Sequence, residues 1–407
     1  MSLPNSLPYS ESNDSICNIS TFNSLGFSNN DYISLEDLES QLDKEALLCC
    51  RSFFRRSVLN QRSYICKKNS NCQIGKGELC RSCRFDRCLL CGMDFRTIQK
   101  FPDGFNIEQI SALLTEKKRQ LKEKSLIMIL LYTDNNLLHI RYSETDLSSS
   151  IFYNKSISDI INNIGGGGLN YSILSRSDQF SNQRRVPKSL AFYQERMRES
   201  DKGISEGPVS PNWLFIDSFL IIEMTKTLPV LNQLSFEDKV RLYTRNGLAT
   251  IVFSQLYYSL NIQGSEFLIF PNGFSPLLLH THSKLFYLVF YKHINIMKEF
   301  NLSREEFLII RTLIFLHSAK SDLSMMGYEI VQTEIEKLSK ALMFYECRKL
   351  GDTGGAGRVV NLMMTLNAAF QFEKAHRKFL NQKGKQKKIV PKFMHVILEH
   401  SDERTLS

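Results

Sequence analysis

Four cysteines between residues 66 and 83 constrain the fold of this chain more than any other feature. Cys66, Cys72, Cys80 and Cys83 follow the spacing C-x5-C-x7-C-x2-C, and seven of the ten cysteines lie between residues 49 and 88. Four thiolates are enough for one closed tetrahedral zinc site. Clustered cysteines with a C-x2-C pair favour metal binding in a reducing compartment over the disulfides of a secreted protein. The spacing therefore predicts a small module stabilised by zinc.

Basic side chains surround these cysteines. In residues 50–88 only Glu78 and Asp86 are acidic. The basic residues of the same stretch are Arg51, Arg55, Arg56, Arg62, Lys67, Lys68, Lys76, Arg81, Arg84 and Arg87. A compact metal-bound module with this charge is suited to following the phosphates of DNA. The chain's net charge of +9 is thus concentrated where a nucleic-acid contact would need it.

Length and composition indicate an ordinary globular protein around this module. The chain has 407 residues, of which 43% are hydrophobic and 23% charged, so two or three domains and one large core are expected. The first residues have neither the basic start nor the apolar stretch of a secretory signal. No apolar run approaches the length of a membrane span. We expect a soluble, intracellular protein without a membrane partner.

The regions on either side of the cysteine module differ in character. Residues 1–35 are rich in Ser and Asn and are expected to be disordered. Residues 36–100 contain the zinc module, and residues 101–210 have the mixed composition of a linker. Within that linker, Gly165–Gly168 predict a flexible break, because no Lys-Ser/Thr pair follows them as in a phosphate loop.

Residues 211–407 have the pattern of a helical domain. Six segments have helical length and apolar spacing: 212–228, 236–260, 284–300, 303–318, 325–350 and 357–381. Ser235 and Ser303 stand where N-caps are expected, each with an acidic residue three positions later. The glycine-rich stretch 351–358 predicts a helix–helix connection. The alternating apolar residues of 266–274, around Pro-Asn-Gly, predict a short β-hairpin.

Two stretches resemble the nuclear hormone receptor family, particularly its divergent nematode-type members. The first, C-x2-FFRRS…Y-x-C-x5-C…C-x2-CRF-x2-C-x2-C-GM, spans residues 50–93. The second, KTLPVLNQLSFEDKVRLYTRNG at 226–247, resembles the signature of helices 3 to 5 in the ligand-binding domain. The resemblance implies a zinc-finger DNA-binding domain at 36–100, a hinge at 101–210, and a mainly α-helical ligand-binding domain with a short β-hairpin at 211–407.

The resemblance also implies two zinc sites of four cysteines each, but only the second is complete. Cys66, Cys72, Cys80 and Cys83 match the second site. Cys50 matches the fourth ligand of the first site, whereas its third position is Leu47. Only Cys17 precedes Cys49, so the first C-x2-C pair has no counterpart. We therefore expect one zinc ion, held at the second site, and a truncated first finger for which a further zinc ion is doubtful.

By the same resemblance, the helix around residues 47–58 would enter the DNA groove. Arg51 would contact a base, and Arg55 and Arg56 would contact phosphates. Arg81 and Arg84, beside the second zinc site, are further DNA-binding candidates. The alternative is that these arginines only form a solvated basic surface.

The helical domain would, by resemblance, bind a lipophilic ligand and coregulator proteins. Candidates to line the ligand pocket are Phe219, Met224, Tyr257, Tyr258, Phe267, Ile269 and Phe270, each of which is equally consistent with an ordinary core position. Lys226 and Glu399 match the pair that holds a coregulator helix by its two dipole ends. The segment 357–381 matches the family's dimerisation helix.

Three hypotheses follow. The leading one is a nuclear-receptor transcription factor, located in the nucleus, that binds DNA response-element half-sites through its zinc fingers. The second is a receptor-like regulator that does not bind DNA and acts through dimerisation or coregulator sequestration. The third is that residues 1–47 are not the natural N-terminus. The chain has no HExxH sequence and no nucleophile elbow, so an enzyme is not expected.

Overall fold

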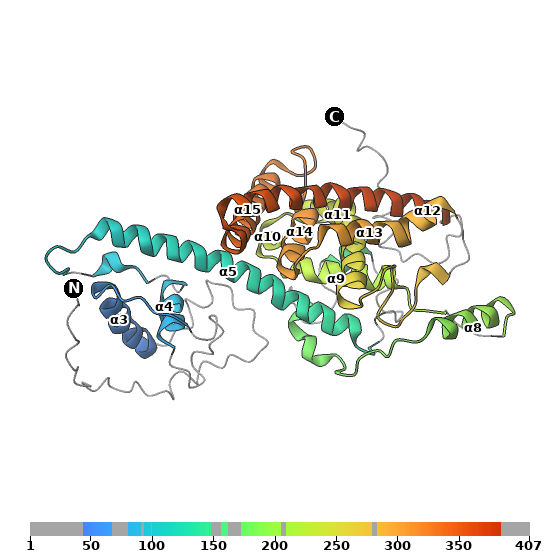
Figure 1. Ribbon diagram of the computed structural model, residues 1–407, viewed down its shortest axis with the longest axis horizontal. Coiled ribbons are helices and arrows are strands. Elements are labelled where there is room, and N and C mark those ends of the chain that lie inside the picture. The colour runs from blue at the N-terminus through green and yellow to red at the C-terminus, as the bar shows by residue number, and fades with distance from the viewer. Residues whose placement is uncertain are drawn as a thin grey trace, which may run out of the picture. The chain divides into compact units, whose positions relative to one another are not determined.

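The computed structural model describes residues 44–66, 80–90, 93–98, 100–145, 147, 156–161, 172–204, 209–278 and 283–383. These residues are almost entirely helical and form no strand beyond one isolated bridge between Ser143 and Arg184. The chain divides into two compact units, Met1–Lys122 and Glu123–Ser407. Figure 1 shows the helices of both units. Predictions for residues 1–35, including disorder, and for Gly165–Gly168 and Glu399 lie outside the described residues.

The smaller unit is built from α3 (Lys44–Leu59), α4 (Arg81–Leu90), η1 (Phe95–Thr97) and the first part of α5 (Ile107–Tyr142). One face of α3 packs against one face of α4, and the Phe54 and Phe85 rings stack with centroids 5.4 Å apart. The buried side chains of this core are Phe53, Phe54, Val58, Phe85, Cys88, Leu89, Phe95, Ile98 and Ile110. The core fixes the orientation of α3 relative to the cysteines beside α4.

Helix α5 crosses the boundary between the two units. It has 36 residues and lies within the stretch for which the sequence predicts a hinge. In its second part Leu130, Leu137 and Ile140 are buried in the core of the larger unit. This region therefore contributes to a folded core, and the domain limits at 100 and 210 stay predictions.

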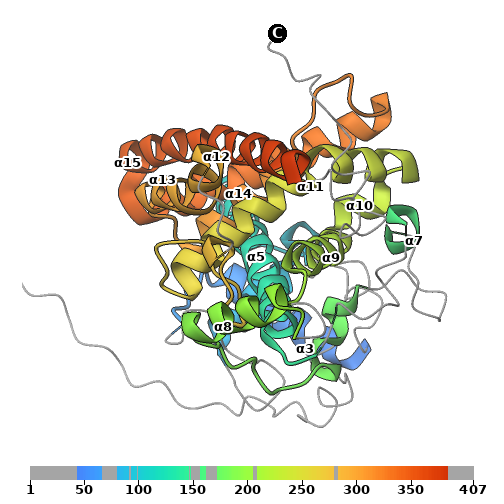
Figure 2. The same ribbon diagram turned by 90° about the vertical axis from the view of Figure 1, so that its right-hand side faces the viewer.

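The larger unit is a bundle of helices around α11 (Phe236–Tyr257), which packs against α9, α14 and α15 (Figure 2). The other elements, in chain order, are α7 (Ile157–Ile161), η2 (Ile173–Gln179), α8 (Leu190–Asp201), α9 (Trp213–Lys226), α10 (Pro229–Gln233), η3 (Tyr258–Ile262), η4 (Pro276–Leu278), α12 (Lys284–Tyr287), η5 (Leu288–Lys292), α13 (His293–Phe300), α14 (Arg304–Leu316) and α15 (Met325–Lys383). Helix α9 is buried nearly all round, as its uniformly apolar sequence predicts.

Local signals in the sequence set several helix ends. Ser303 accepts a hydrogen bond from the Glu306 N–H, and the Glu306 carboxylate accepts one from the Ser303 N–H, which completes a capping box. Ser235 caps α11 through the Asp238 N–H. Gly351, with φ of 76°, breaks α15 at the start of the glycine-rich stretch. These caps and this break agree with the sequence prediction.

The predicted β-hairpin at 266–274 is wrong. These residues form a loop that contains no strand. The loop does reverse direction, since the Phe270 N–H donates to the Phe274 carbonyl at 2.9 Å. Two further backbone groups donate to neighbouring π-helical turns: the Leu268 N–H to the Phe290 carbonyl, and the Ile269 N–H to Ser259 Oγ. The apolar alternation thus reflects a loop held between helices and not a strand pair.

No described helix combines the length and the apolar character that a membrane crossing requires.

Candidate zinc centre and nucleic-acid interface

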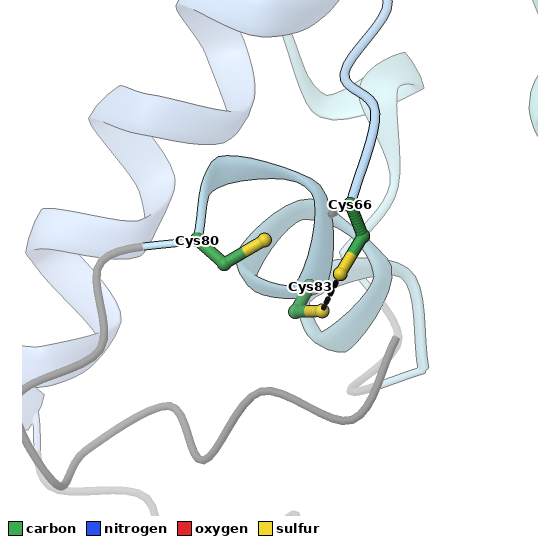
Figure 3. A group of neighbouring side chains, drawn as sticks. All are labelled: Cys66, Cys80 and Cys83. Carbon is green, nitrogen blue, oxygen red and sulfur yellow. Dashed lines mark hydrogen bonds between the residues drawn. The ribbon is translucent and has the colours of Figure 1, made fainter. Parts of the chain in front are cut away.

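Three of the predicted zinc ligands come together at the start of α4 (Figure 3). Cys80 directly precedes α4, Cys83 lies in its first turn, and Cys66 lies on the segment that follows α3. The three sulfur atoms lie within 4.8 Å of one another. The Cys83 and Cys66 sulfurs are 3.6 Å apart. Cys72, the fourth predicted ligand, lies outside the described residues.

This arrangement fits zinc. With Zn–S bonds of about 2.3 Å, a tetrahedral site places its sulfur atoms roughly 3.8 Å apart, which is close to the observed separation. The N-terminal end of α4 places partial positive charge beside these sulfur atoms. Cys88, on the buried face of the same helix, belongs to the hydrophobic core. The thiols at the start of α4 are thus the ones placed to hold a metal.

Helix α3 separates an arginine face from a core face. Arg51, Arg55 and Arg56 are exposed, whereas Phe53 and Phe54 are buried. The core face is fixed further by the Tyr64 ring, which stacks on Phe53, and by the Tyr64 hydroxyl, 2.9 Å from Ser57 Oγ. The side chains of residues 44–50, including the predicted ligand Cys50, lie outside the described part.

The arginines beside the second zinc site differ in environment. Arg81 is exposed at the start of α4. The Arg84 guanidinium lies over the Phe53 ring, 4.5 Å from its centroid, and is partly buried. This contact joins α4 to the helix that carries the arginine face, so Arg84 also has a structural role.

Lys117 makes a contact with α4 that the sequence does not predict. Its Nζ lies 2.9 Å from Asp86 Oδ1 and 4.8 Å from the Phe85 ring centroid. In the sequence Lys117 belongs to a basic run with Lys118, Arg119, Lys122 and Lys124, which gives no sign of a contact with α4. The structure uses it to attach α5 to α4, and no local signal links residues so far apart in the sequence.

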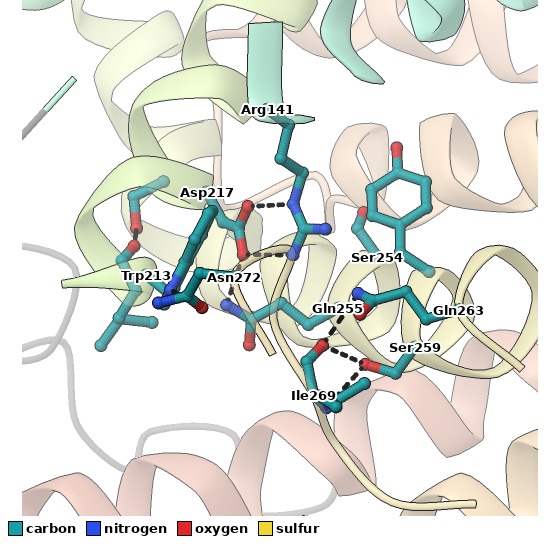
Figure 4. Close-up of polar contacts among 12 residues, drawn as sticks. Arg141, Trp213, Asp217, Ser254, Gln255, Ser259, Gln263, Ile269 and Asn272 are labelled. Carbon is teal, nitrogen blue, oxygen red and sulfur yellow. Dashed lines mark hydrogen bonds and ion pairs between the residues drawn. The ribbon is translucent and has the colours of Figure 1, made fainter. Parts of the chain in front are cut away.

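In the larger unit buried polar side chains join four segments (Figure 4). Arg141 on α5 donates to both carboxylate oxygens of Asp217 on α9, at 2.6 and 3.1 Å. Gln255 on α11 donates to the same carboxylate at 2.8 Å. Nearby, the Trp213 indole N–H donates to Asn272 at 3.0 Å. These side chains hold α5, α9, α11 and the 265–275 loop together.

The predicted pocket-lining tyrosines lie in contact with buried groups. The Tyr257 ring stacks on Phe307 with centroids 3.7 Å apart, and burial raises the pKa of Tyr257 to about 12. The Tyr258 hydroxyl donates to Asp134 at 2.6 Å and accepts from Arg311 at 2.6 Å. Burial raises the pKa of Tyr258 well above its usual range.

The remaining pocket candidates are spread over the bundle. Phe219 and Met224 are buried on α9, and Phe270 stacks on Trp213 with centroids 5.5 Å apart. Ile269 and Phe267 are half-buried. Phe267 lines a surface pocket of about 290 Å³ beside α8. Their role as ligand contacts stays a prediction.

Lys226, the predicted coregulator contact, ends α9. Its Nζ lies 2.6 Å from Glu223 Oε1, and only 10% of the side chain is exposed. The other oxygen of Glu223 accepts a hydrogen bond from the Ile173 N–H at 2.8 Å. The lysine is therefore held within the bundle by a glutamate one turn before it.

Two protein-family models match the chain. Residues 44–95 match the double treble clef zinc finger of C4 type. Residues 212–383 match the ligand-binding domain of nuclear hormone receptors. The chain belongs to the nuclear hormone receptor family. The receptor is a transcription factor with a DNA-binding zinc finger and a ligand-binding domain, and it is not an enzyme.

Several curated proteins of a nematode are similar to the receptor. Nuclear hormone receptor family member nhr-10 of Caenorhabditis elegans is 23% identical over 342 residues, which cover 77% of this chain and 80% of that relative. Member nhr-209 of the same organism is 24% identical over 332 residues, covering 77% and 74%. Member nhr-1 is 44% identical over 52 residues, which cover 12% of each chain.

Proposed function

We propose that this receptor binds double-stranded DNA through the exposed face of α3, in a module stabilised by one zinc ion. Arg51 contacts a base edge in the major groove, and Arg55 and Arg56 contact phosphates. The observation that most supports this proposal is that these three arginines are exposed on a helix whose opposite face packs against α4. A rigidly held cationic helix loses little conformational freedom when it binds.

Cys66, Cys72, Cys80 and Cys83 hold the zinc ion. Zinc supplies no reaction here; its coordination links the segment after α3 to the start of α4. Structural zinc in small fingers contributes on the order of 10 kcal/mol to folding. The convergence of three of these sulfurs supports the assignment. With one or two thiols at the first site, we propose a single zinc per chain.

The helical domain regulates transcription through a small lipophilic ligand and through coregulators. Lys226 is the contact for a short coregulator helix, together with Glu399. Val360 and Met364, one turn apart on α15 and 65% and 66% exposed, offer an apolar stripe for a homodimer or heterodimer partner. The receptor acts in the nucleus, where its DNA lies.

The test is DNA binding by the full chain at several salt concentrations, with a fluorescent duplex selected from a random pool. Arg55→Ala with Arg56→Ala should weaken binding to all sequences and flatten the salt slope by about one unit for each lost phosphate contact. Arg51→Ala should instead relax preference at one base pair, by roughly 1–3 kcal/mol. Arg198→Ala, an exposed site on α8, is the matched control.

A second candidate is a receptor that regulates without binding DNA. The observation that favours it is the missing set of cysteines before Cys49. In that case the full chain shows only weak, sequence-independent binding, and the arginine variants equal the control. A selected duplex that binds well above the random pool excludes this second candidate.

A further inference from the structure

The two parts of α15 meet at a tightly packed joint around Glu346. The helix breaks at Gly351, where φ is 76°. A Cβ on Gly355 would lie 2.7 Å from the Glu346 carbonyl carbon, so the start of the second part packs directly against the backbone of the first. Glu346 is fully buried at this joint.

Arg358 connects the second part of α15 to α13 and α14. Its Nε donates to Glu306 Oε1 at 2.7 Å, and its Nη2 donates to Glu306 Oε2 at 2.9 Å. The same Nη2 donates to the Phe300 and Asn301 carbonyls at the end of α13, each at 3.0 Å. Glu306 also accepts a hydrogen bond from the Ser303 N–H at 2.6 Å. One arginine therefore neutralises Glu306 and holds the joint closed.

Glu346 adds a second carboxyl group to this joint without a second cation. Neither of its oxygens receives a hydrogen bond from a donor in the described part of the chain. The group that faces it from α14 is the carboxyl of Glu306, which is 1% exposed. Glu306 and Arg358 already balance each other, so an ionised Glu346 would leave one uncompensated negative charge in the interior. Two carboxyl groups that face each other in such a site are stable when they share one proton.

The other charged groups near Glu346 are engaged elsewhere. Lys349, on the same part of α15, is exposed, and its Nζ lies over the Tyr345 ring, 5.6 Å from the centroid. The Tyr345 hydroxyl donates to Glu305 Oε2, at the start of α14, at 3.2 Å. These contacts lie at the edge of the joint, and the buried pair of carboxyl groups depends on the proton for its balance.

The proton belongs mainly to Glu346. Burial and the negative charge of Glu306 raise the pKa of Glu346 to about 7. Against the effect of burial, the hydrogen bonds from Arg358 lower the pKa of Glu306. The closed joint thus binds one more proton near neutral pH than an open joint, in which water reaches Glu346. Its stability is therefore lost as pH rises.

We propose that one proton shared by Glu346 and Glu306 acts as a switch on the joint of α15, holding the second part of the helix against α14 and releasing it as pH rises past neutrality. Once the proton is lost, two like charges face each other in a buried site with one arginine, and opening of the joint relieves their repulsion. The released part carries Val360 and Met364, so the switch also acts on the proposed partner surface. That consequence rests on the proposed function, whereas the switch itself does not.

Hydrogen exchange of the full chain at pH 6 and pH 8 tests the switch. Glu346→Gln removes the titratable group, and Glu336→Gln, at a side chain 70% exposed on the same part of α15, is the matched control. Each variant is compared with wild type at the same pH, so the effect of pH on the exchange chemistry of the amides cancels.

The expected size of the effect follows from linkage. With a pKa of 4.5 in the open joint and about 7 in the closed one, Glu346 makes the equilibrium constant for opening about tenfold larger at pH 8 than at pH 6. Over residues 356–364 the ratio of exchange rates between wild type and Glu346→Gln should rise by this factor, and the ratio between wild type and Glu336→Gln should stay constant. A constant ratio for Glu346→Gln overturns the proposal.

The amides of α11 separate opening of the joint from unfolding of the whole unit. We expect residues 356–364 of wild type to exchange faster at pH 8 than the amides of α11, because the joint opens while the bundle stays folded. Equal opening constants for both sets of amides would mean that only global unfolding exposes the joint, and this result overturns the switch.

A second measurement, on the unaltered chain, guards against a Glu346→Gln variant that fails to fold. In the infrared difference spectrum of wild type between pH 6 and pH 8, we expect the band of a protonated carboxyl group to be lost at the higher pH. The absence of this band at pH 6 means that Glu346 is already ionised and overturns the proposal. If Val360→Ser with Met364→Ser leaves partner association unchanged, the partner surface is removed and both results on the switch stand.

Discussion

Arg141 on α5 and Asp217 on α9 form a buried ion pair, with Arg141 Nε 2.6 Å from Asp217 Oδ1 and exposed side-chain fractions of 0% and 6%. The two residues are 76 positions apart in the sequence. The pair attaches the second part of α5 to the helix that carries Lys226. It makes the segment predicted to be a hinge part of the ligand-binding unit's core.

Replacing Arg141 with methionine should destabilise the larger unit by about 3–5 kcal/mol, because Asp217 is left as a buried carboxylate without a cation. Urea unfolding followed by circular dichroism measures the change. Arg198→Met is the control, since its ion pair with Glu195 is 69% and 61% exposed and should contribute less than about 1 kcal/mol. Equal midpoints for the two variants would contradict a structural role of the buried pair.

Glu346, fully buried on the first part of α15, should make stability depend on pH. Burial and the negative charge of Glu306 raise the pKa of Glu346 from 4.5 to about 7. Between pH 4.5 and pH 7 or so, Glu346 is protonated in the folded state and ionised in the unfolded state. The folded state therefore binds more protons, and its stability falls as pH rises. Glu346→Gln should remove this fall and stabilise the protein at pH 8 by roughly 3 kcal/mol, because one pKa unit corresponds to about 1.4 kcal/mol.

The measurement for Glu346 is the urea midpoint of both proteins from pH 5 to pH 8. The difference should grow with pH and level off above about 7. Glu336→Gln is the control, because the Glu336 side chain is 70% exposed beside Lys340. A difference between Glu346→Gln and wild type that is constant over this range would show that Glu346 is ionised throughout.

Replacing either of two glycines after the break in α15 with alanine should change the stability of the protein, but in opposite directions. A Cβ on Gly355 would lie 2.5 Å from the Cys347 backbone nitrogen, so Gly355→Ala forces the two parts of α15 apart. We expect a loss of about 1–3 kcal/mol. A Cβ on Gly357 meets nothing within 4 Å, and alanine there should gain up to about 1 kcal/mol through helix propensity. Thermal melting of both variants gives the comparison.

Local signals in the sequence predicted local structure well. The Ser303 capping box, the Ser235 cap and the break at Gly351 each depend on residues within four positions, so the sequence determines them directly. The cysteine spacing also predicts that Cys66, Cys80 and Cys83 lie together, and their three sulfur atoms do converge. The hairpin prediction was wrong because the N–H groups of Leu268 and Ile269 donate to residues of two π-helical turns and not to a partner strand.

Non-local pairs were not predictable from one sequence. A lone Asp217 in an apolar helix gives no sign that Arg141 neutralises it. Lys117 in a basic run gives no sign that it binds Asp86. In α7 the sequence shows the apolar spacing of Ile157, Ile160 and Ile161. The surface that buries these side chains is formed by helices that follow much later in the chain.

The central claim is a DNA-binding module held by one zinc ion, and metal analysis of the purified full chain tests it most directly. We predict close to one zinc per chain, with Cys83→Ser losing both the metal and DNA binding. Two zinc ions per chain would show that the first finger is complete. A chain without zinc that still binds DNA with the same affinity would show that the module does not depend on metal.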